Sequence, residues 1–231
     1  MNPLIELHGV SKVYEMGRKK AAVVAVQGID LAVKQGEFAV ITGRSGSGKT
    51  TLLNLVSGLT RPTSGQVLLD QVEVWRLPDL QQSQLRNRKI GFVFQFPSLM
   101  PSLTALENVI LPAMAGPDPD PEATKRRAAR LLVEVGLEDK LAAYPRQLSA
   151  GQQQRVVIAR SLVNDPDLLL ADEPTSDLDE QTEEEIMTLF QGIYARRGIT
   201  ILLVTHATEL VRYGTRSVRM ASGQIVADAA A

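Results

Sequence analysis

Residues 43–50 of this 231-residue chain read Gly-Arg-Ser-Gly-Ser-Gly-Lys-Thr, which matches the pattern GxxxxGK followed by Ser or Thr. The residues before this segment, 38–42, form a short apolar run typical of a buried strand, and residues 50–56 begin like a helix. Glycines allow the tight turn between the two elements and let backbone N–H groups point inward at an anion. The segment therefore predicts an α/β protein that binds the phosphates of a nucleoside triphosphate. The alternative is a glycine-rich turn with a solvated lysine.

Two side chains of this segment suit phosphate chemistry. The Lys49 ammonium adds a full positive charge to the partial charge of the helix N-terminus, and the Thr50 hydroxyl can hold Mg²⁺. The candidate nucleotide contacts are Gly43, Arg44, Ser45, Gly46, Ser47, Gly48, Lys49, Thr50 and Thr51.

Composition excludes several classes of function. The 25 Lys and Arg residues are balanced by 26 Asp and Glu residues, and no stretch is basic enough to predict a nucleic-acid interface. The chain has no cysteine, which removes disulfides, thiolate metal sites and cysteine nucleophiles. No apolar run approaches the roughly 18 residues that span a bilayer, and the first residues lack the charged start and apolar middle of a signal peptide. We therefore expect a cytosolic protein.

The order of apolar and turn-forming segments predicts the organisation of the chain. Residues 3–40 alternate apolar stretches with turn signals and predict antiparallel strands, with a polar loop at 15–20 between two of them. Residues 116–121 form a proline-rich loop, and the spacing that follows predicts a helix over 122–135. Further elements are expected as strands at 66–69, 90–94, 168–170 and 199–204 and as a helix at 180–194. The expected fold is a mostly parallel α/β core with an antiparallel β edge and a helical insertion at about residues 95–157.

Two acidic residues follow the apolar run at 168–171. A buried strand would deliver Asp172 to its carboxyl end, beside the Mg²⁺ of the phosphate-binding segment. Glu173 would then lie next to the γ-phosphate, where a carboxylate can orient and deprotonate an attacking water. The alternative is a solvated acid pair at the end of a strand.

A second candidate anion site lies just upstream, where residues 148–155 read Leu-Ser-Ala-Gly-Gln-Gln-Gln-Arg. Small residues followed by a helix combine a hydroxyl, exposed N–H groups and a helix N-terminus. The segment resembles the LSGGQ signature of ATP-binding-cassette (ABC) ATPases, which closes on ATP held by the partner of a dimer. The resemblance implies that Ser149, Gly151 and Gln152 contact the nucleotide of a second chain. The alternative is a Ser-Gly helix cap.

The resemblance to an ABC nucleotide-binding domain extends over essentially the whole chain. Tyr14 matches the aromatic residue that stacks on adenine, although a tyrosine in an edge strand can also simply pack. Gln95 matches the Q-loop glutamine, which contacts Mg²⁺ and the attacking water. Residues 176–179 match the D-loop, and the last of them, Asp179, is a candidate nucleotide contact. His206, at the end of a predicted strand, matches the switch histidine that contacts the γ-phosphate; the alternative is a structural histidine.

This resemblance implies an α/β P-loop NTPase fold: a RecA-like core with a mostly parallel sheet, an antiparallel β subdomain and an inserted α-helical subdomain. Residues 1–231 would form one ABC ATP-binding domain, with the core and β subdomain at about 1–94 and 158–231 and the helical subdomain at about 95–157. The implied ligands are ATP and Mg²⁺. The residues implied for Mg²⁺ are Thr50, Gln95 and Asp172, and those implied for hydrolysis are Lys49, Gln95, Glu173 and His206.

Two residues depart from the family pattern. Ala150 replaces the first signature glycine, and another small residue should keep the backbone geometry. Asp177 stands where the D-loop usually has a small or neutral residue, which places an extra carboxylate near the expected dimer interface.

The chain resembles transporter subunits more than soluble ABC ATPases, because it has one cassette, no cysteine and no heptad run. Residues 96–109 are similar to the macrolide-exporter, lipoprotein-release and cell-division group, and their apolar side chains would line a groove for a permease helix or belong to the helical core. The implied assembly is a homodimer that sandwiches two ATP molecules and binds a separate transmembrane permease at the cytoplasmic face of the membrane. No nucleic-acid partner is expected; the alternative is a soluble ABC ATPase acting on nucleic acid or ribosomes. The permease recognises the cargo, so this sequence does not specify the cargo or the direction of transport.

Overall fold

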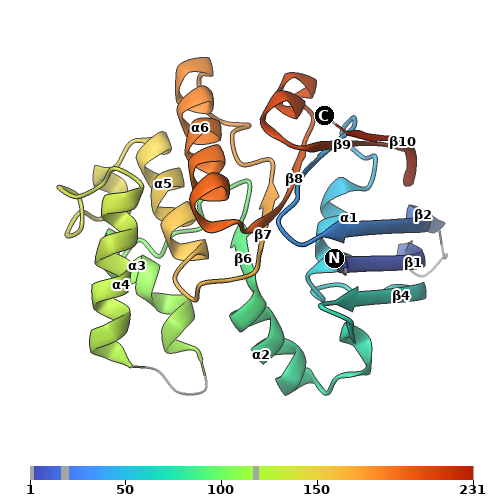
Figure 1. Ribbon diagram of the computed structural model, residues 1–231, viewed down its shortest axis with the longest axis horizontal. Coiled ribbons are helices and arrows are strands. Elements are labelled where there is room, and N and C mark those ends of the chain that lie inside the picture. Colours follow the sequence, from blue (N-terminus) through green and yellow to red (C-terminus); the bar gives the residue numbers. More distant parts are fainter. Residues whose placement is uncertain (1–2, 17–20, 117–119, 231) are drawn as a thin grey trace. The chain divides into compact units, whose positions relative to one another are not determined.

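The computed structural model describes residues 3–16, 21–116 and 120–230 (Figure 1). Backbone contacts divide the chain into two compact units. The first unit consists of Met1–Gln82 and Thr200–Ala231, and the second of Ser83–Ile199. The chain passes from the first unit to the second within helix α2, Asp79–Lys89.

The first unit contains a four-stranded antiparallel sheet with the order β2-β1-β4-β5. Its strands are β1 Pro3–Met16, β2 Ala21–Lys34, β4 Ser64–Leu69 and β5 Val72–Glu73. The antiparallel strands expected near the N-terminus are confirmed. The polar loop expected at 15–20 was wrong at its start, because Glu15 and Met16 pair with Ala22 and Ala21 as the last residues of β1. Cross-strand pairing here outweighs local polarity; residues 17–20 lie outside the described residues.

The phosphate-binding segment lies between β3, Phe38–Thr42, and α1, Lys49–Val56, as predicted. Strand β3 is buried along its whole length and pairs in parallel with β8, Thr200–Thr205, and with β9, Arg216–Ala221. Strand β10, Gln224–Ala230, pairs antiparallel with β9. A central parallel strand is covered on both faces, which explains the continuous apolar sequence of β3. Two short 3-10 helices, η1 Val74–Arg76 and η3 Thr208–Tyr213, also belong to this unit.

The second unit contains two parallel strands and most of the helices (Figure 1). Its elements are β6 Ile90–Val93, α3 Ala105–Met114, α4 Pro121–Glu134, η2 Pro145–Gln147, α5 Ala150–Ser161, β7 Leu168–Asp172 and α6 Glu180–Arg197. Helices α3, α4 and α5 pack on one another, and α6 contacts α5.

Capping side chains define where the helices of the second unit begin. Thr104 and Glu107 form a reciprocal capping box at the start of α3, and Asp120 accepts the Ala123 N–H at the start of α4. Helix α4 begins at Pro121, one position before the predicted start, because proline lacks only an N–H that has no partner in the first helical turn. Residues 117–119 of the predicted loop lie outside the described residues.

Two helices, α2 and α3, are absent from the sequence prediction, and α6 ends at Arg197 instead of Tyr194. The subdomain boundaries inferred from the sequence remain a prediction. In the part of the chain that the structure describes, no helix is long and apolar enough to cross a membrane.

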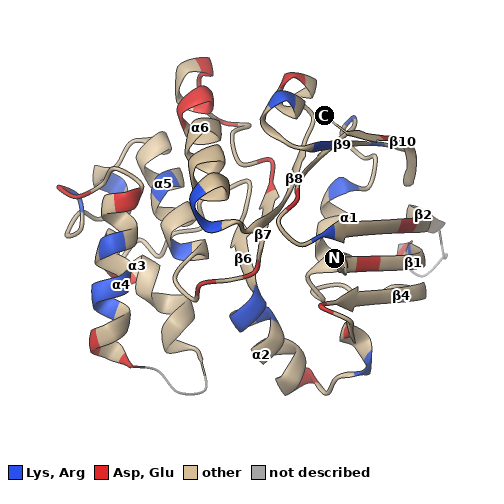
Figure 2. Cartoon of the chain, in the orientation of Figure 1, with Lys and Arg blue, Asp and Glu red and all other residues tan. Residues whose placement is uncertain are grey.

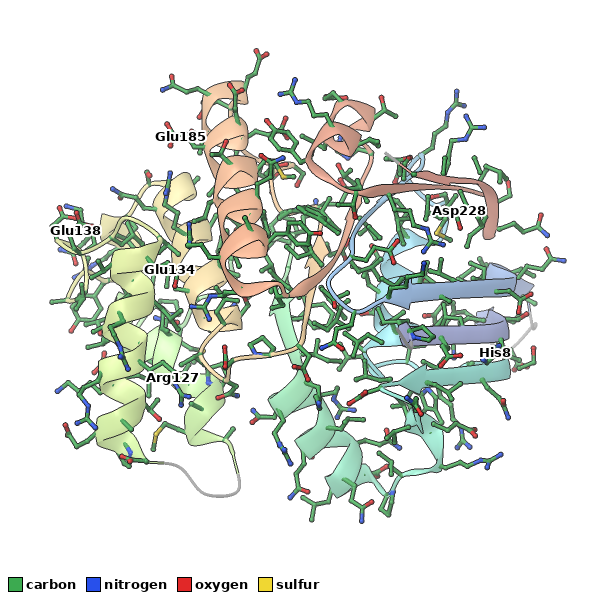
Figure 3. All side chains as sticks on the ribbon, viewed as in Figure 1. His8, Arg127, Glu134, Glu138, Glu185 and Asp228 are labelled. Atoms are coloured by element: carbon green, nitrogen blue, oxygen red, sulfur yellow. The ribbon has the colours of Figure 1, made fainter. Side chains whose placement is uncertain are left out.

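Ion pairs join α6 to its neighbours in the second unit. Figure 2 colours the acidic and basic residues of these helices, and Figure 3 labels the carboxylates Glu134 and Glu185. Glu134, at the end of α4, accepts hydrogen bonds from Arg196 at 3.1 Å and from Arg197 at 2.7 Å. Partial burial raises the pKa of Glu134, but the two guanidinium groups outweigh it and hold the pKa below its usual value. Arg155 of α5 pairs with Glu185 of α6 at 3.0 Å.

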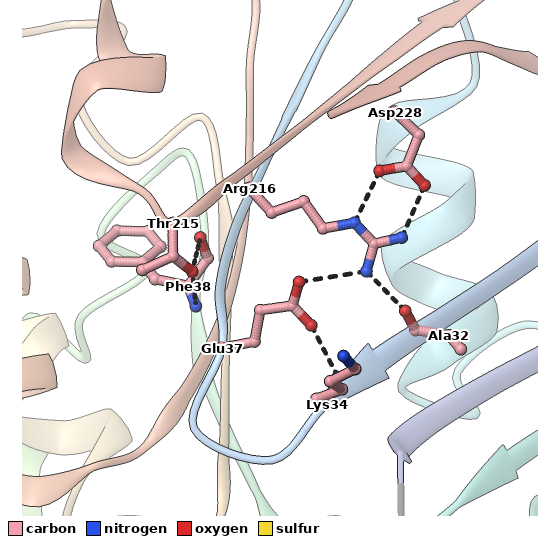
Figure 4. Close-up of polar contacts among 7 residues, drawn as sticks. All are labelled: Ala32, Lys34, Glu37, Phe38, Thr215, Arg216 and Asp228. Carbon is pink, nitrogen blue, oxygen red and sulfur yellow. Dashed lines mark hydrogen bonds and ion pairs between the residues drawn. The ribbon is translucent and has the colours of Figure 1, made fainter. Parts of the chain in front are cut away.

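A second polar network joins strand ends in the first unit (Figure 4). Arg216 of β9 donates from Nε and Nη2 to both carboxylate oxygens of Asp228 in β10, at 2.7 and 2.6 Å. Its Nη1 donates to the carbonyl of Ala32 at 2.7 Å and to Glu37 at 3.2 Å, while Glu37 also accepts the Lys34 N–H at 2.7 Å. The hydrogen bonds from Arg216 lower the pKa of Asp228 and outweigh the opposite effect of its partial burial.

Candidate functional site

The backbone of residues 43–48 turns around the N-terminus of α1. Gly46 and Gly48 have φ angles of 78° and 99°, in the left-handed region that favours glycine. A side chain at Gly48 would collide with the Ala25 carbonyl, whereas a Cβ at Gly46 would meet nothing within 4 Å. Helix α1 has no side-chain cap at Gly48 and no acidic residue in its first turn. Its N-terminus therefore carries a partial positive charge that no side chain of the first turn offsets.

Two buried side chains of this loop fit the oxygens of a phosphate. Ser47 is 5% exposed, and its hydroxyl oxygen has no hydrogen-bond partner among the described residues. Lys49 is 6% exposed and donates from Nζ to the carbonyls of Gly43 at 2.8 Å and Arg44 at 3.3 Å. A buried unpaired hydroxyl is costly, and an anion satisfies a buried ammonium better than neutral carbonyls do. The loop therefore has the geometry and charge of an anion site.

The loop also offers exposed groups, among them the Thr50 side chain at the start of α1. Within the described residues, no group of three or more His, Asp or Glu side chains is placed to hold a metal by itself. Mg²⁺ usually takes one or two protein ligands and completes its shell with substrate phosphates and water. A hydroxyl beside a phosphate site therefore fits Mg²⁺ that arrives with a nucleotide.

His206 lies at the same edge of the sheet as the loop. Thr42 of β3 is the register partner of Thr205 of β8, so Gly43 and His206 each directly follow one of two paired residues. The Thr205 hydroxyl accepts the Ala207 N–H at 3.0 Å, which turns the chain immediately after the exposed His206. The first unit thus places the phosphate loop and the predicted switch histidine next to each other.

Tyr14 lies on β1 and is 37% exposed, so its ring is a surface group. The Lys12 ammonium lies 5.0 Å from the ring centroid and is fixed by a 2.8 Å hydrogen bond to the Arg61 carbonyl. The predicted contact of Tyr14 with adenine remains a prediction.

The second unit brings three predicted site residues to one edge of its strand pair: the predicted catalytic residues Gln95 and Glu173 and the predicted Mg²⁺ ligand Asp172. Val93 of β6 is the register partner of Ala171 of β7, so Gln95 and the two acids all lie at the carboxyl ends of neighbouring parallel strands. Asp172 is the last residue of β7. Glu173 has a φ of 46°, a left-handed conformation that is unfavourable for any residue with a Cβ. Backbone strain of this kind is concentrated at functional sites.

The predicted signature forms the start of α5. Ser149 is the N-cap: its Oγ accepts the Gln152 N–H at 3.2 Å, and the Gln152 side chain accepts the Ser149 N–H at 3.0 Å. Ser149 is exposed, and no acceptor for its hydroxyl proton is found among the described residues. The helix-cap interpretation and the nucleotide-contact interpretation are therefore compatible.

Position 151 requires glycine because helix α6 packs closely against it. A Cβ at this position would lie 2.6 Å from Cγ2 of Thr182 in the first turn of α6. Thr182 is itself fixed by Asp179, which accepts its N–H at 3.0 Å and its hydroxyl at 2.7 Å. These bonds hold the pKa of Asp179 below its usual value. The signature and the last D-loop residue are thus packed through Thr182. Ala150, in contrast, is exposed, which explains why a methyl group is tolerated there.

Sequence reasoning missed Thr182 because it lies outside every motif. Its one signal was its position three residues after Asp179, the spacing of an N-cap and the N–H that it binds.

Comparison with known proteins agrees with this geometry. The family model described as "ABC transporter" matches residues 26–176. A Thermotoga maritima protein, described as an uncharacterized ABC transporter ATP-binding protein, is 51% identical over 225 residues, which cover 97% of this chain and 94% of that protein. The lipoprotein-releasing system ATP-binding protein LolD of Geobacter metallireducens is 44% identical over 229 residues, covering 99% of this chain and 100% of that protein.

A solved structure is similar over nearly the whole chain. The ATP-binding cassette MJ0796 of Methanocaldococcus jannaschii, in a dimeric structure bound to ADP and Pi, superposes with a TM-score of 0.88 at 40% identity and covers 98% of each chain. The P-loop fold class and the resemblance inferred from the motifs are confirmed, while these relatives give no support to the nucleic-acid alternative. The chain belongs to the ABC transporter family, among its ATP-binding proteins.

Proposed function

We propose that this chain is the ATP-hydrolysing subunit of a membrane ABC transporter, and that it couples closure of an ATP-bound homodimer to movement of a separate transmembrane permease. The observation that carries the proposal is the phosphate loop, in which the unpaired Ser47 hydroxyl and the buried Lys49 ammonium belong to residues at an uncapped helix N-terminus. These groups would bind the β- and γ-phosphates of ATP.

The remaining predicted residues fit the steps of phosphoryl transfer to water. Thr50, Gln95 and Asp172 would hold Mg²⁺, which neutralises charge on the phosphate oxygens and orients them. Glu173 would accept a proton from the attacking water as the water oxygen bonds to the γ-phosphorus and ADP leaves. His206, beside the loop, would donate a hydrogen bond to the γ-phosphate. Tyr14 would stack on adenine.

The dimeric assembly is supported by the exposed signature. Ser149 uses its lone pair as a helix cap and keeps its hydroxyl proton for an acceptor, which a γ-phosphate held by a second chain would provide. The MJ0796 cassette is dimeric in its structure with ADP and Pi. The permease would hold the homodimer at the cytoplasmic face of the membrane.

Replacement of Glu173 tests this proposal. We expect Glu173→Gln to lower the rate of phosphate release by roughly 10²–10⁴-fold, because the amide cannot accept the proton of the attacking water. The variant should still bind Mg-ATP and form a stable ATP-dependent dimer, which size-exclusion chromatography measures. Glu180→Gln, in the first turn of α6, is the matched control and should hydrolyse ATP at the normal rate. Normal turnover by Glu173→Gln would contradict the assignment of the base.

A further inference from the structure

Arg160, in the last turn of α5, holds the chain just beyond Gln95. Its Nη2 donates to the carbonyl of Pro97 and its Nη1 to the carbonyl of Ser98, both at 3.0 Å. Ser98 has a φ of 45°, and its own hydroxyl donates to the Phe96 carbonyl at 3.2 Å. One planar side chain therefore fixes two consecutive peptide groups of an irregular segment.

Among the described residues, the Arg160 guanidinium donates hydrogen bonds to these two carbonyls and to no other group. Within the described residues, no carboxylate lies within ion-pair distance of the guanidinium. Burial lowers the pKa of Arg160, yet an arginine keeps its charge at neutral pH. A partly buried cation without an ion pair is unfavourable unless its N–H groups are satisfied. The hydrogen bonds to the carbonyls of Pro97 and Ser98 therefore offset the cost of burying the Arg160 charge.

The same segment is held a second time, from α3. The fully buried Asn108 accepts the Met100 N–H at 2.7 Å and donates to the carbonyls of Met100, Leu103 and Thr104 at 2.9–3.2 Å. Two large apolar side chains of this segment are exposed: Phe96 is 64% exposed and Met100 is 50% exposed. Residues 96–100, which we call the Q-segment, are thus an apolar surface attached to α3 and α5 by side-chain hydrogen bonds.

Helix α5 has the signature at its other end. Ser149 caps the first turn and Arg160 lies in the last, about 17 Å away at the rise of an α-helix. From this we infer that Arg160 is a positioning residue that makes the Q-segment move with α5, so that engagement of nucleotide by Ser149 displaces the apolar surface around Phe96 and Met100. The inference rests on the proposed function, because it requires Ser149 to contact the nucleotide of a second chain.

The geometry explains why only arginine can do this. Two N–H groups in one rigid plane hold two carbonyls at a fixed spacing, whereas the lysine ammonium is a point donor on a flexible stem. Arg160→Lys therefore preserves the charge and removes the double contact. Arg155→Lys is a matched control on the same helix, because Arg155 holds the Val135 carbonyl and Glu185 instead of the Q-segment.

Hydrogen–deuterium exchange of the full chain tests the inference. All variants carry Glu173→Gln so that Mg-ATP, the probe, is not consumed. In the parent chain, which carries only Glu173→Gln, Mg-ATP should slow exchange by about tenfold in two peptides, one containing Ser149 and one covering the Q-segment. Tenfold is about the effect of one charge-assisted hydrogen bond on an equilibrium. With Arg160→Lys, the Ser149 peptide should keep its protection and the Q-segment should lose most of it. Arg155→Lys should keep both.

Each outcome is informative. Full protection of the Q-segment in Arg160→Lys would overturn the inference and leave the proposed function intact. Protection in neither peptide of the parent would overturn both. If Arg160→Lys lowers the melting temperature, the parent still decides: a protected Ser149 peptide beside an unresponsive Q-segment refutes the coupling without any change at Arg160.

A kinetic measurement separates positioning from general destabilisation. In the active chain, which keeps Glu173, Arg160→Lys should lower kcat by about tenfold and change the KM for ATP by less than about twofold. The reason is that ATP binding to the phosphate loop does not involve the Q-segment. A parallel change in kcat and KM, or loss of activity only near the melting temperature, would indicate a merely structural role.

Discussion

The backbone at Gly151 lies so close to Thr182 that even a methyl side chain at position 151 would clash. We expect Gly151→Ala to destabilise the chain by roughly 1–3 kcal/mol, the usual cost of overpacking. It should also lower ATP turnover, because relief of the clash displaces the signature from the D-loop. Urea unfolding and phosphate release measure the two effects.

A second substitution should reverse the first. Thr182→Ser removes the Cγ2 that causes the clash and keeps the hydroxyl that binds Asp179. The double variant Gly151→Ala, Thr182→Ser should therefore recover most of the stability and activity. Ala150→Gly, at the exposed neighbouring position, is the control and should change little. A double variant as impaired as Gly151→Ala alone would show that the methyl group acts by another route.

At the scale of residues, motifs located the groups that have a distinctive local sequence. The phosphate loop and the acids after β7 were predicted because their residue types and order are rare outside phosphate sites. Thr182, Arg160 and Asn108 could not be predicted. Their partners are backbone atoms, which for Arg160 and Thr182 are remote in the chain, and such contacts leave no periodic or compositional signal in the sequence.

At the scale of elements, Arg216 joins β9 to β10 and to the end of β2 (Figure 4). The folded-state pKa of Asp228 is depressed, so its contribution to stability is complete above the unfolded-state pKa, about 4, and is lost as the pH falls through the folded-state value. We expect Asp228→Asn to lower the free energy of unfolding by about 1 kcal/mol at pH 7, a modest value because the carboxylate is partly exposed.

This difference should stay constant from pH 8 to pH 5 and shrink below about pH 4, as chemical unfolding at several pH values measures. Glu138→Gln is the control, since Glu138 is an exposed carboxylate for which the structure gives no ion pair (Figure 3). A difference that persists unchanged at pH 3 would show that packing, and not the ion pair, carries the effect.

Elements with one strong pattern were predicted well, and those with mixed patterns were not. The wholly buried β3 and β8 have continuous apolar sequences. Helix α2 was missed because its sequence is mostly polar, with two leucines that form no apolar stripe, and Gln82 is its one buried residue. Helix α3 was missed for two reasons. Pro112 lies inside it, and its N-cap Thr104 lies within residues 96–109, whose apolar side chains were interpreted as lining a groove or as part of the helical core.

At the scale of the whole molecule, the proposed dimer has two identical composite sites. Each would combine the phosphate loop of one chain with the signature of the other. We expect Lys49→Ala and Ser149→Arg to be inactive separately, since either change damages both sites of a homodimer. In a mixture, half of the dimers would be heterodimers with one intact and one doubly damaged site. Activity should return to about one quarter of the wild-type value if the sites act independently.

Phosphate release from the mixture measures this complementation. The Ser149→Arg chain should still bind ATP as a monomer, because its own phosphate loop is intact. A mixture with no more activity than its separate components would show that loop and signature act within one chain.

The reciprocal cap at Ser149 affects how fast the proposed dimer can form. Its bonds are local, so the signature surface is already ordered in a single chain before a partner arrives. Docking of two preformed surfaces does not have to freeze loose backbone, and association is then limited by collision and orientation. The lifetime of the closed dimer, and not a slow folding step, would then limit the turnover rate of the subunit.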